Sequence, residues 1–339
     1  GADVIIALSH QDLDQDQALA RELPEINLIV GGHEHFFIEK QIGKTWITKA
    51  DADIKSAIVH DIQVNPGGTV ETSHQHIELD SSIEKDPIVQ AEIENQLARL
   101  EKVFQKSGKD MRQVLGHTQY LLEGVEPAVR GRETALGDFL ADVIRERMKS
   151  DVAFTNGGGI RINDNIPPGP VTTYDMEGIF YYDNNLVSFE LTGAQLLDIL
   201  RVSVSKSHLG DGRFLQVSGI RFKYHVKDQA GKPAYSIEAT DVEIKPQGSK
   251  VFMPLELDKK YRAGTTDFIL DKGYTDGYGL FSKGAGKSSP PRLNPGSEVG
   301  FRRAVEQAMA NLPGNTITNR VEGRITRLEE QATIESPEP

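Results

Sequence analysis

The chain has 339 residues, of which 38% are hydrophobic, and this is enough for two domains that each bury a core. Its formal net charge is −12, and acidic and basic residues are mixed along most of the sequence, which argues against DNA, RNA or an anionic membrane as a partner. The longest apolar runs are far shorter than the roughly 20 residues that a membrane-spanning helix needs. Cysteine is absent, which excludes disulfides and thiolate metal ligands but does not indicate a compartment.

The first residues are typical of α/β architecture. The apolar runs VIIAL and INLIV are separated by the amphipathic segment DLDQDQALARELP, which predicts a strand, a helix and a strand. Because GADVIIALSH starts inside an apolar run, without an initiator Met or a secretory signal, we expect the chain to be a piece of a longer protein. Between Trp46 and Leu79 the pattern is β-like, and a Pro-Gly-Gly turn predicts an antiparallel hairpin.

A long amphipathic helix is predicted over residues 82–105, and we expect it to connect two domains. The second domain alternates helices and strands to about residue 328. Its helices have N-cap signals at Thr134 and at Thr192, which forms a capping box with Gln195. The segment KYRAGTTDFIL reads as a strand that includes Phe268, and the tail QATIESPEP reads as disordered.

Three histidines follow apolar runs in the first domain: His10, His33 and His35. In an extended segment, residues two apart face the same side, so His33 and His35 can face one site while Glu34 points away. Two glycines before His33 would let the backbone turn sharply and approach a ligand. Neutral imidazole is a common metal ligand, and a pair of divalent cations can polarise a phosphoryl oxygen and activate water. The pattern favours a metal site over ordinary polar loop residues.

The carboxylates that would bridge two metal ions are not visible near these histidines. Asp12, Asp14 and Asp16 are the nearest candidates, but they lie on a helix that we expect to be solvated.

The sequence from VIIALSH to LARELPEINLIVGGHEH resembles the closing half of the calcineurin-type metallophosphoesterase domain of the 5′-nucleotidase family. The resemblance implies two divalent metal ions (Zn, Mn, Mg or Ca), with His10 and His33 on one ion and His35 on the other. The family's D-x-H, G-D-x-x-D and G-N-H-[ED] motifs, which supply the other ligands and a catalytic His, are absent from this chain. We therefore identify no catalytic residue here and expect the chain alone to be weakly active or inactive.

Two further segments, RGRETALGDFLADVI and FTNGGGIR, are similar to the C-terminal domain of the same family. The glycines of the second segment would let backbone N–H groups approach a ligand, and a tight turn with a surface arginine is the alternative. Arg132, in the first segment, could have a structural role in which it pairs with a carboxylate and does not contact a ligand. The resemblance implies that the substrate is contacted by Arg130, Asn156, Gly158 and Arg161.

Members of this family hold the nucleobase between two aromatic rings. The resemblance assigns these rings to Tyr182 and Phe268, and places Asp276 at the base or ribose edge. Tyr274 is a rival for the second ring because two extra residues separate Phe268 from Asp276. A core position is the alternative for Phe268.

The expected fold is α/β with α+β character in the second domain. Residues 1–82 are expected to be the C-terminal part of a metallophosphoesterase αββα sandwich, and residues 83–110 a linking helix and hinge. Residues 111–330 are expected to form a mixed α/β 5′-nucleotidase C-terminal domain, followed by a disordered tail over 331–339.

The resemblance implies a phosphoric monoester hydrolase that converts nucleoside 5′-monophosphates to nucleoside and phosphate. It implies a location in the periplasm, at the cell surface or outside the cell, and a small-molecule nucleotide as the partner. Two alternatives stay open: a UDP-sugar hydrolase or 2′,3′-cyclic nucleotide phosphodiesterase of the same family, and a non-catalytic nucleoside-binding surface protein.

Overall fold

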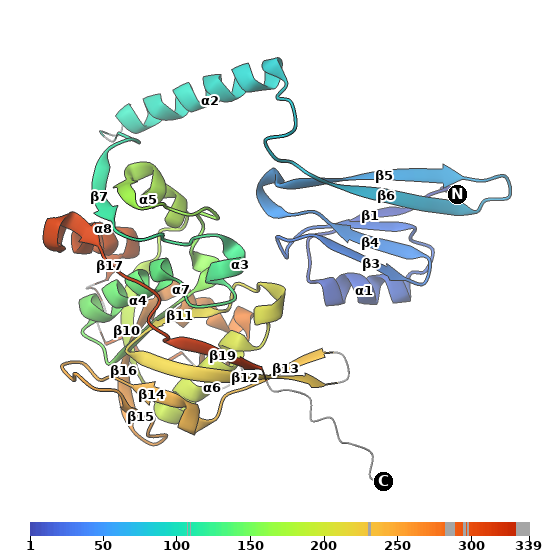
Figure 1. Ribbon diagram of the computed structural model, residues 1–339. Helices are drawn as coiled ribbons and strands as arrows, with labels where there is room; N and C mark the ends of the chain where they lie inside the picture. Colours follow the sequence, from blue (N-terminus) through green and yellow to red (C-terminus); the bar gives the residue numbers. More distant parts are fainter. Residues whose placement is uncertain are drawn as a thin grey trace, which may run out of the picture. The chain divides into compact units, whose positions relative to one another are not determined.

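The computed structural model describes residues 1–106, 108, 110–229, 232–281, 289–293, 296 and 298–329. The fold is mixed α/β, as predicted. The chain divides into two compact units, Gly1–Arg99 and the residues from Leu100 onward. This division falls within helix α2 (Pro87–Lys106), which is the long helix expected from the sequence (Figure 1). The tail 331–339 lies outside the described residues.

The first unit contains a four-stranded sheet with the strand order β1-β2-β4-β3. The first three of these strands are parallel to one another, and β3 is antiparallel to β4. Because side chains alternate along a strand, Ile47 and Lys49 lie on the face covered by α1, and Trp46 and Thr48 lie on the other. The elements are β1 (Ile6–Leu8), α1 (Leu13–Glu22), β2 (Leu28–Gly31), β3 (Ile38–Ile42) and β4 (Thr45–Lys49).

The predicted hairpin is present as β5 (Ser56–Val64) and β6 (Val70–Glu78). It packs on the second face of the sheet, where the ring of His60 lies 3.1 Å from the Thr48 hydroxyl and the ring of His74 packs edge-on against Trp46. Figure 1 shows the sheet between α1 and this hairpin. The first unit is therefore layered, with one face of the sheet facing a helix and the other facing a β-ribbon.

A five-stranded sheet with the order β11-β8-β16-β10-β17 forms the centre of the second unit. β8 and β16 are parallel, and every other neighbouring pair is antiparallel. The strands are β8 (Val152–Asn156), β10 (Asn185–Thr192), β11 (Leu215–Ser218), β16 (Lys260–Thr266) and β17 (Val299–Gly300).

This sheet separates two hydrophobic cores. Ala153 of β8 packs on one side with α4, α5 and α8, and the next residue, Phe154, packs on the other side with α6 and α7. Both strand faces are thus buried, which is why these strands read as nearly continuous apolar runs. The helices are α3 (Glu126–Val129), α4 (Ala135–Met148), α5 (Thr173–Ile179), α6 (Gly193–Val204), α7 (Asp267–Lys272) and α8 (Phe301–Asn311).

Two smaller sheets complete the second unit. In one, the order is β13-β12-β14-β15, and β19 lies alongside β12 in parallel; in the other, the order is β18-β7-β9. The bounds are β7 (Val114–Thr118), β9 (Gly169–Thr172), β12 (Ile220–Gln229), β13 (Lys232–Ser236), β14 (Val242–Ile244), β15 (Met253–Pro254), β18 (Thr316–Ile317) and β19 (Ile325–Glu329).

The predicted helix starts are confirmed. The Thr134 hydroxyl accepts a hydrogen bond from the Gly137 N–H at 3.0 Å, and Thr192 and Gln195 form the reciprocal capping box. The predicted strand through Phe268 is wrong. β16 ends at Thr266, whose hydroxyl caps α7, so Phe268 lies in the first turn of a helix.

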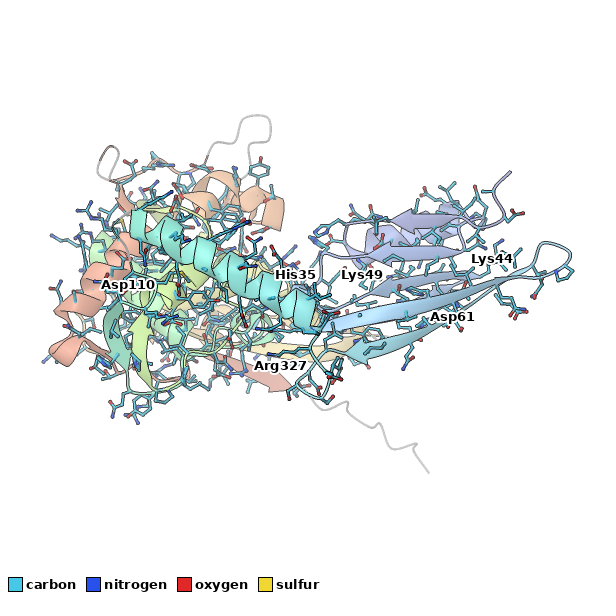
Figure 2. The ribbon with its side chains drawn as sticks, turned by 90° about the horizontal axis from the view of Figure 1, so that it is seen from above. His35, Lys44, Lys49, Asp61, Asp110 and Arg327 are labelled. Atoms are coloured by element: carbon cyan, nitrogen blue, oxygen red, sulfur yellow. The ribbon has the colours of Figure 1, made fainter. Side chains whose placement is uncertain are left out.

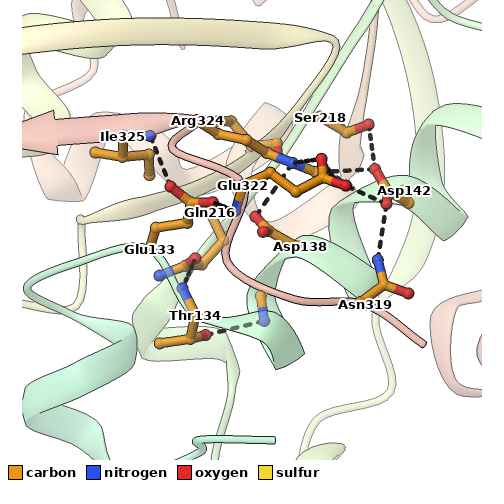
Figure 3. Close-up of polar contacts among 12 residues, drawn as sticks. Glu133, Thr134, Asp138, Asp142, Gln216, Ser218, Asn319, Glu322, Arg324 and Ile325 are labelled. Carbon is orange, nitrogen blue, oxygen red and sulfur yellow. Dashed lines mark hydrogen bonds and ion pairs between the residues drawn. The ribbon is translucent and has the colours of Figure 1, made fainter. Parts of the chain in front are cut away.

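Arg324 ties the last strand of the second unit to α4. Its guanidinium donates to both oxygens of Asp142, at 2.7 and 2.9 Å. Glu133 accepts backbone N–H bonds from Glu322, two residues before this arginine, and from Ile325, the residue after it, at 2.6 and 3.0 Å (Figure 3). Charge-assisted contacts of this kind hold β19 in register beside β12.

Asp138 is fully buried beside the same arginine, with its Oδ1 at 3.5 Å from the Arg324 Nε (Figure 3). Neither of its carboxyl oxygens accepts a hydrogen bond from the described residues. Burial raises the pKa of Asp138 to about 9; Arg324 opposes this shift, while Glu133 and Asp142 add to it. This shift favours the protonated form of Asp138 at neutral pH.

Replacing Asp138 with Asn is expected to flatten the pH dependence of stability. Folding raises the pKa of Asp138 from 3.8 to about 9, so the folded protein holds a proton that the unfolded chain releases, and wild-type stability falls as the pH rises through this window. The free energy of unfolding should be measured in urea at about pH 5, 7 and 9. The exposed Asp198→Asn variant is the control. Parallel pH curves for the wild type and Asp138→Asn would contradict the assignment.

Candidate functional site

Four chain segments meet at one edge of the central sheet of the second unit. The parallel strands β8 and β16 end there, at Asn156 and Thr266, and β10 and β11 begin there, at Asn185 and Leu215. The antiparallel pairing of Leu215 with Asn156 sets part of this register. The carboxyl ends of parallel strands are a common position for ligand sites in α/β sheets.

In the loop after β8, the neighbouring backbone leaves no room for a side chain at Gly157 or Gly158. The Gly157 N–H donates to the Phe214 carbonyl at 2.6 Å, and the Gly158 N–H donates to the Gly212 carbonyl at 2.9 Å. A Cβ atom on Gly158 would lie 2.9 Å from the Gly212 Cα. Close packing against a neighbouring loop, and not free N–H groups, therefore explains Gly157 and Gly158.

Arg130 and Arg161 share one carboxylate. The Arg130 Nη2 lies 2.5 Å from the Glu126 Oε1, and the Arg161 Nη1 lies 3.5 Å from the same oxygen. Arg130 is buried, and within the part of the chain that the structure describes its Nε has no hydrogen-bond partner. Burial lowers the pKa of Arg130, and Glu126 opposes this shift. Within this group, two guanidinium groups share one carboxylate, and the Arg130 Nε is an unused donor.

Arg132 has the structural role that the sequence left open. Its guanidinium binds both oxygens of Glu123, at 2.7 and 2.8 Å, and its side chain is 56% exposed. Arg132 is therefore engaged away from the Arg130–Glu126–Arg161 group.

Asp211 and Arg213 form a charged pair that acts on the Asp276 carboxyl, and neither residue was predicted from the sequence. The Asp211 Oδ1 accepts from the backbone N–H and the Nε of Arg213, both at 2.9 Å. The Arg213 Nη1 would lie 3.5 Å from a Cβ on Gly277, and the Tyr278 hydroxyl donates to the Arg213 carbonyl. Burial raises the pKa of Asp276; Asp211 adds to the shift and Arg213 opposes it.

The local signal for this pair is weak. Asp211 and Arg213 stand in the short stretch GDGR before a strand-like run, which reads as a polar loop. Their place in the site follows from the pairing of β11 with β8, which joins residues about 60 positions apart.

The two predicted aromatic residues lie at the same end of the β10–β16 pair. Asn185 donates from its backbone N–H and its side-chain amide to Asp267, both at 3.1 Å, so the segment that follows Tyr182 is tied to the residue before Phe268. Tyr182 is 53% exposed and packs edge-on against Tyr181. Phe268 is half-buried against the core. No ring contact joins Tyr182 to Phe268 among the described residues.

Tyr274 remains a rival for the second ring. It lies two residues before Asp276 on the same short 3-10 helix (Gly273–Asp276), and it is 42% exposed. Its ring is therefore more accessible than the half-buried ring of Phe268.

In the first unit, the His33–Glu34–His35 turn is not extended. His33 has φ 87° and His35 has φ 69°, so both lie in the left-handed region, and the same-side argument for an extended segment is wrong. Glu34 does not point away. Its Oε2 lies 2.5 Å from the Lys49 Nζ, and its Oε1 accepts from the Leu13 N–H at 2.5 Å. His35 and Lys49 are labelled in Figure 2.

Gly31 and Gly32, the two glycines before this turn, leave room for the side chains of Lys49 and His10. Neither has a positive φ. A Cβ on Gly31 would lie 2.8 Å from the Lys49 Cε, and a Cβ on Gly32 would lie 3.1 Å from the His10 Nδ1. Close approach to the Lys49 and His10 side chains explains these glycines, and a positive φ does not.

The predicted metal ligands are only partly brought together. The rings of His10 and His33 lie 5.6 Å apart, and the His33 Nε2 lies 2.9 Å from the Asp12 Oδ1. Across the described ranges, no group of three or more His, Cys, Asp or Glu side chains is placed to hold a metal ion. The imidazoles suit a divalent metal but do not complete its shell. Asp16, expected to be solvated, is fully buried.

Comparison with known proteins shows that this α/β chain is similar to nucleotide phosphoesterases. The family model of the 5′-nucleotidase C-terminal domain matches residues 113–282, and the chain belongs to that family. In the described part of the chain, no helix is both long enough and apolar enough to cross a membrane.

The similar proteins are longer than this chain. The trifunctional nucleotide phosphoesterase YfkN of Bacillus subtilis is 29% identical over 335 residues, which cover 95% of this chain and 21% of YfkN. A snake venom 5′-nucleotidase from Naja atra is 25% identical, over 82% of this chain and 56% of its own length. The crystal structure of a 5′-nucleotidase precursor from Thermus thermophilus superposes with a TM-score of 0.77 at 25% identity, covering 98% of this chain and 65% of that one.

Removing the carboxylate shared by the two arginines is expected to destabilise the second unit. Glu126→Ala leaves Arg130 buried without its ion-pair partner, which costs about 3–5 kcal/mol of unfolding free energy. Glu123→Ala is the matched control, because its partner Arg132 is exposed and the expected loss is about 1 kcal/mol or less. Urea unfolding measures both, and equal losses would show that the Glu126 pair is not a buried structural contact.

Proposed function

We propose that this chain is the substrate-binding domain, with an adjoining part of the hydrolytic domain, of an enzyme that hydrolyses nucleoside 5′-monophosphates to nucleoside and phosphate. The observation that carries this proposal is the gathering of predicted substrate contacts at one edge of the central sheet: the Arg130–Glu126–Arg161 group, the Asn156 loop and two aromatic residues. The membership of the 5′-nucleotidase family supports it.

In this proposal, Arg130 and Arg161 bind the phosphate or ribose. Their positive charge exceeds that of the one carboxylate they share, and the Arg130 Nε offers a donor that the described protein leaves unused. Asn156 and Gly158 contact the nucleoside from the end of β8, and Asp276 binds the base or ribose edge.

The nucleobase stacks on Tyr182 and on a second ring, Phe268 or Tyr274. Stacking suits a nucleotide substrate because every base has an aromatic face. The exposure of Tyr182 and the link between Asn185 and Asp267 support this arrangement.

We propose that His10, His33 and His35 supply imidazole ligands to two divalent ions (Zn, Mn, Mg or Ca). Such ions polarise a phosphoryl oxygen and activate water when bound. The described residues do not complete either shell, so the proposed chemistry needs ligands and catalytic groups in addition to these three histidines. The chain alone is accordingly proposed to be weakly active or inactive.

The proposed domains are residues 1–82, 83–110 and 111–330, with the middle segment as the hinge. The proposed location is the periplasm, the cell surface or the exterior, and the venom relatives support an exported protein.

A second candidate function is a wider phosphoesterase activity on UDP-sugars or 2′,3′-cyclic nucleotides. The similarity to a protein named as a trifunctional nucleotide phosphoesterase favours it. A non-catalytic nucleoside-binding protein is the third candidate, and it would bind nucleosides without turning over any of these substrates. Turnover assays with each of these substrates would distinguish the three.

Adenosine binding by the 339-residue chain tests the pocket. We expect Tyr182→Ala to weaken binding by about 1–3 kcal/mol, because one stacking face is lost. Of Phe268→Ala and Tyr274→Ala, the variant that removes the second stacking ring is expected to have the same effect. Isothermal titration calorimetry gives the Kd of each variant.

Tyr174→Ala removes a 59%-exposed tyrosine from the first turn of α5 and serves as the matched control. It is expected to leave the Kd unchanged. If Tyr182→Ala binds adenosine as tightly as this control does, the proposed stacking site is refuted.

A further inference from the structure

We infer that Glu34 and Lys49 are positioning residues that hold the His33–Glu34–His35 turn in the conformation in which its imidazoles are presented. This inference rests on the proposed function, because His33 and His35 are the proposed metal ligands. Neither Glu34 nor Lys49 belongs to the predicted ligand set. Their role follows from a buried group of contacts behind the turn.

Lys49 lies at the centre of this group. Its Nζ donates to the Gln11 carbonyl at 2.7 Å and to the Glu34 Oε2 at 2.5 Å, and it forms an ion pair with the Asp16 Oδ2 at 2.8 Å. The side chains of Lys49, Asp16 and Glu34 are 1%, 0% and 8% exposed. Water is therefore largely excluded, and each charge depends on its protein partners.

These contacts join three segments of the first unit. Lys49 ends β4, Asp16 belongs to α1, and Glu34 follows β2. Gln11 directly follows His10, so the same ammonium group also holds the loop that carries that histidine. Gly31 keeps the space open, because a Cβ there would collide with the Lys49 side chain.

The turn needs such a hold because its backbone is unfavourable. His33 and His35 both have positive φ, which is uncommon for residues other than glycine and persists when surrounding contacts enforce it. Glu34 lies between them and uses both carboxylate oxygens, one on Lys49 and one on the Leu13 N–H. A side chain anchored at both oxygens fixes the peptide planes on either side, and with them the directions of the two imidazoles.

The test compares Glu34→Ala and Glu34→Gln with the wild type in the full 339-residue chain. Glu34→Ala removes both anchors and leaves Lys49 paired with Asp16, so no buried charge loses its last partner. Glu34→Gln keeps an oxygen for the Leu13 N–H and removes the charge. Glu25→Ala, at an exposed carboxylate just before β2, is the matched control. Circular dichroism verifies folding of each variant.

The first measurement is NMR of protein labelled at histidine and leucine, using the backbone chemical shifts of His33 and His35 and hydrogen exchange at the Leu13 amide. Glu34→Ala is expected to move both histidines out of the left-handed range and to speed Leu13 exchange. Glu34→Gln is expected to give a smaller change, and Glu25→Ala none. Wild-type shifts in folded Glu34→Ala would overturn the inference. If that variant does not fold, wild-type shifts together with wild-type Leu13 exchange in Glu34→Gln would overturn it.

The second measurement is a Zn²⁺ titration of the same imidazole signals. Loss of an orienting partner typically lowers metal affinity about 10- to 100-fold, and we expect a fall in this range for Glu34→Ala. A wild-type chain that binds no Zn²⁺ at these histidines would refute their proposed ligand role. The backbone measurement would still decide the positioning role, so the two failures are distinguishable.

Discussion

The parallel pairing of β8 with β16 is the constraint on which the site of the second unit depends. Because these strands run in the same direction between antiparallel neighbours, two strand ends and two strand starts meet at one edge of the sheet. Residues that are far apart in the sequence, from the Asn156 loop to the Tyr182 and Phe268 segments, thereby come to one place. A fold that exchanged this pair for an antiparallel one would send the glycine loop to the opposite edge.

Buried charge organises the candidate sites of both units, in two different ways. In the first way, charged side chains are buried as ion pairs. Arg130 pairs with Glu126 in the second unit, and Lys49 pairs with Asp16 and Glu34 in the first. Such pairs contribute little net stability but fix geometry, because a partner that moves leaves an unpaired charge behind. Asp138 takes the other route, since burial keeps it protonated beside Glu133.

The two units contribute different chemistry to the proposed nucleotide hydrolysis. The second unit supplies positive charge, amide groups and aromatic faces, which are the means of holding a nucleotide. The first unit supplies imidazoles on a turn held from behind by a buried carboxylate. Among the described residues of the first unit, no group of side chains completes a metal site, and the chain spans only part of the length of its relatives.

The sequence by itself determined the elements whose signals are local: the hairpin, the helix caps at Thr134 and Thr192, and most strands. It also contained the motifs of the 5′-nucleotidase family. Only the tertiary structure decided that Glu34 turns inward to Lys49, that Asp211 and Arg213 join the site, and that β16 ends before Phe268. Periodicity and caps depend on residues within a turn or two, whereas the partner of a charged side chain is set by which distant strands pair.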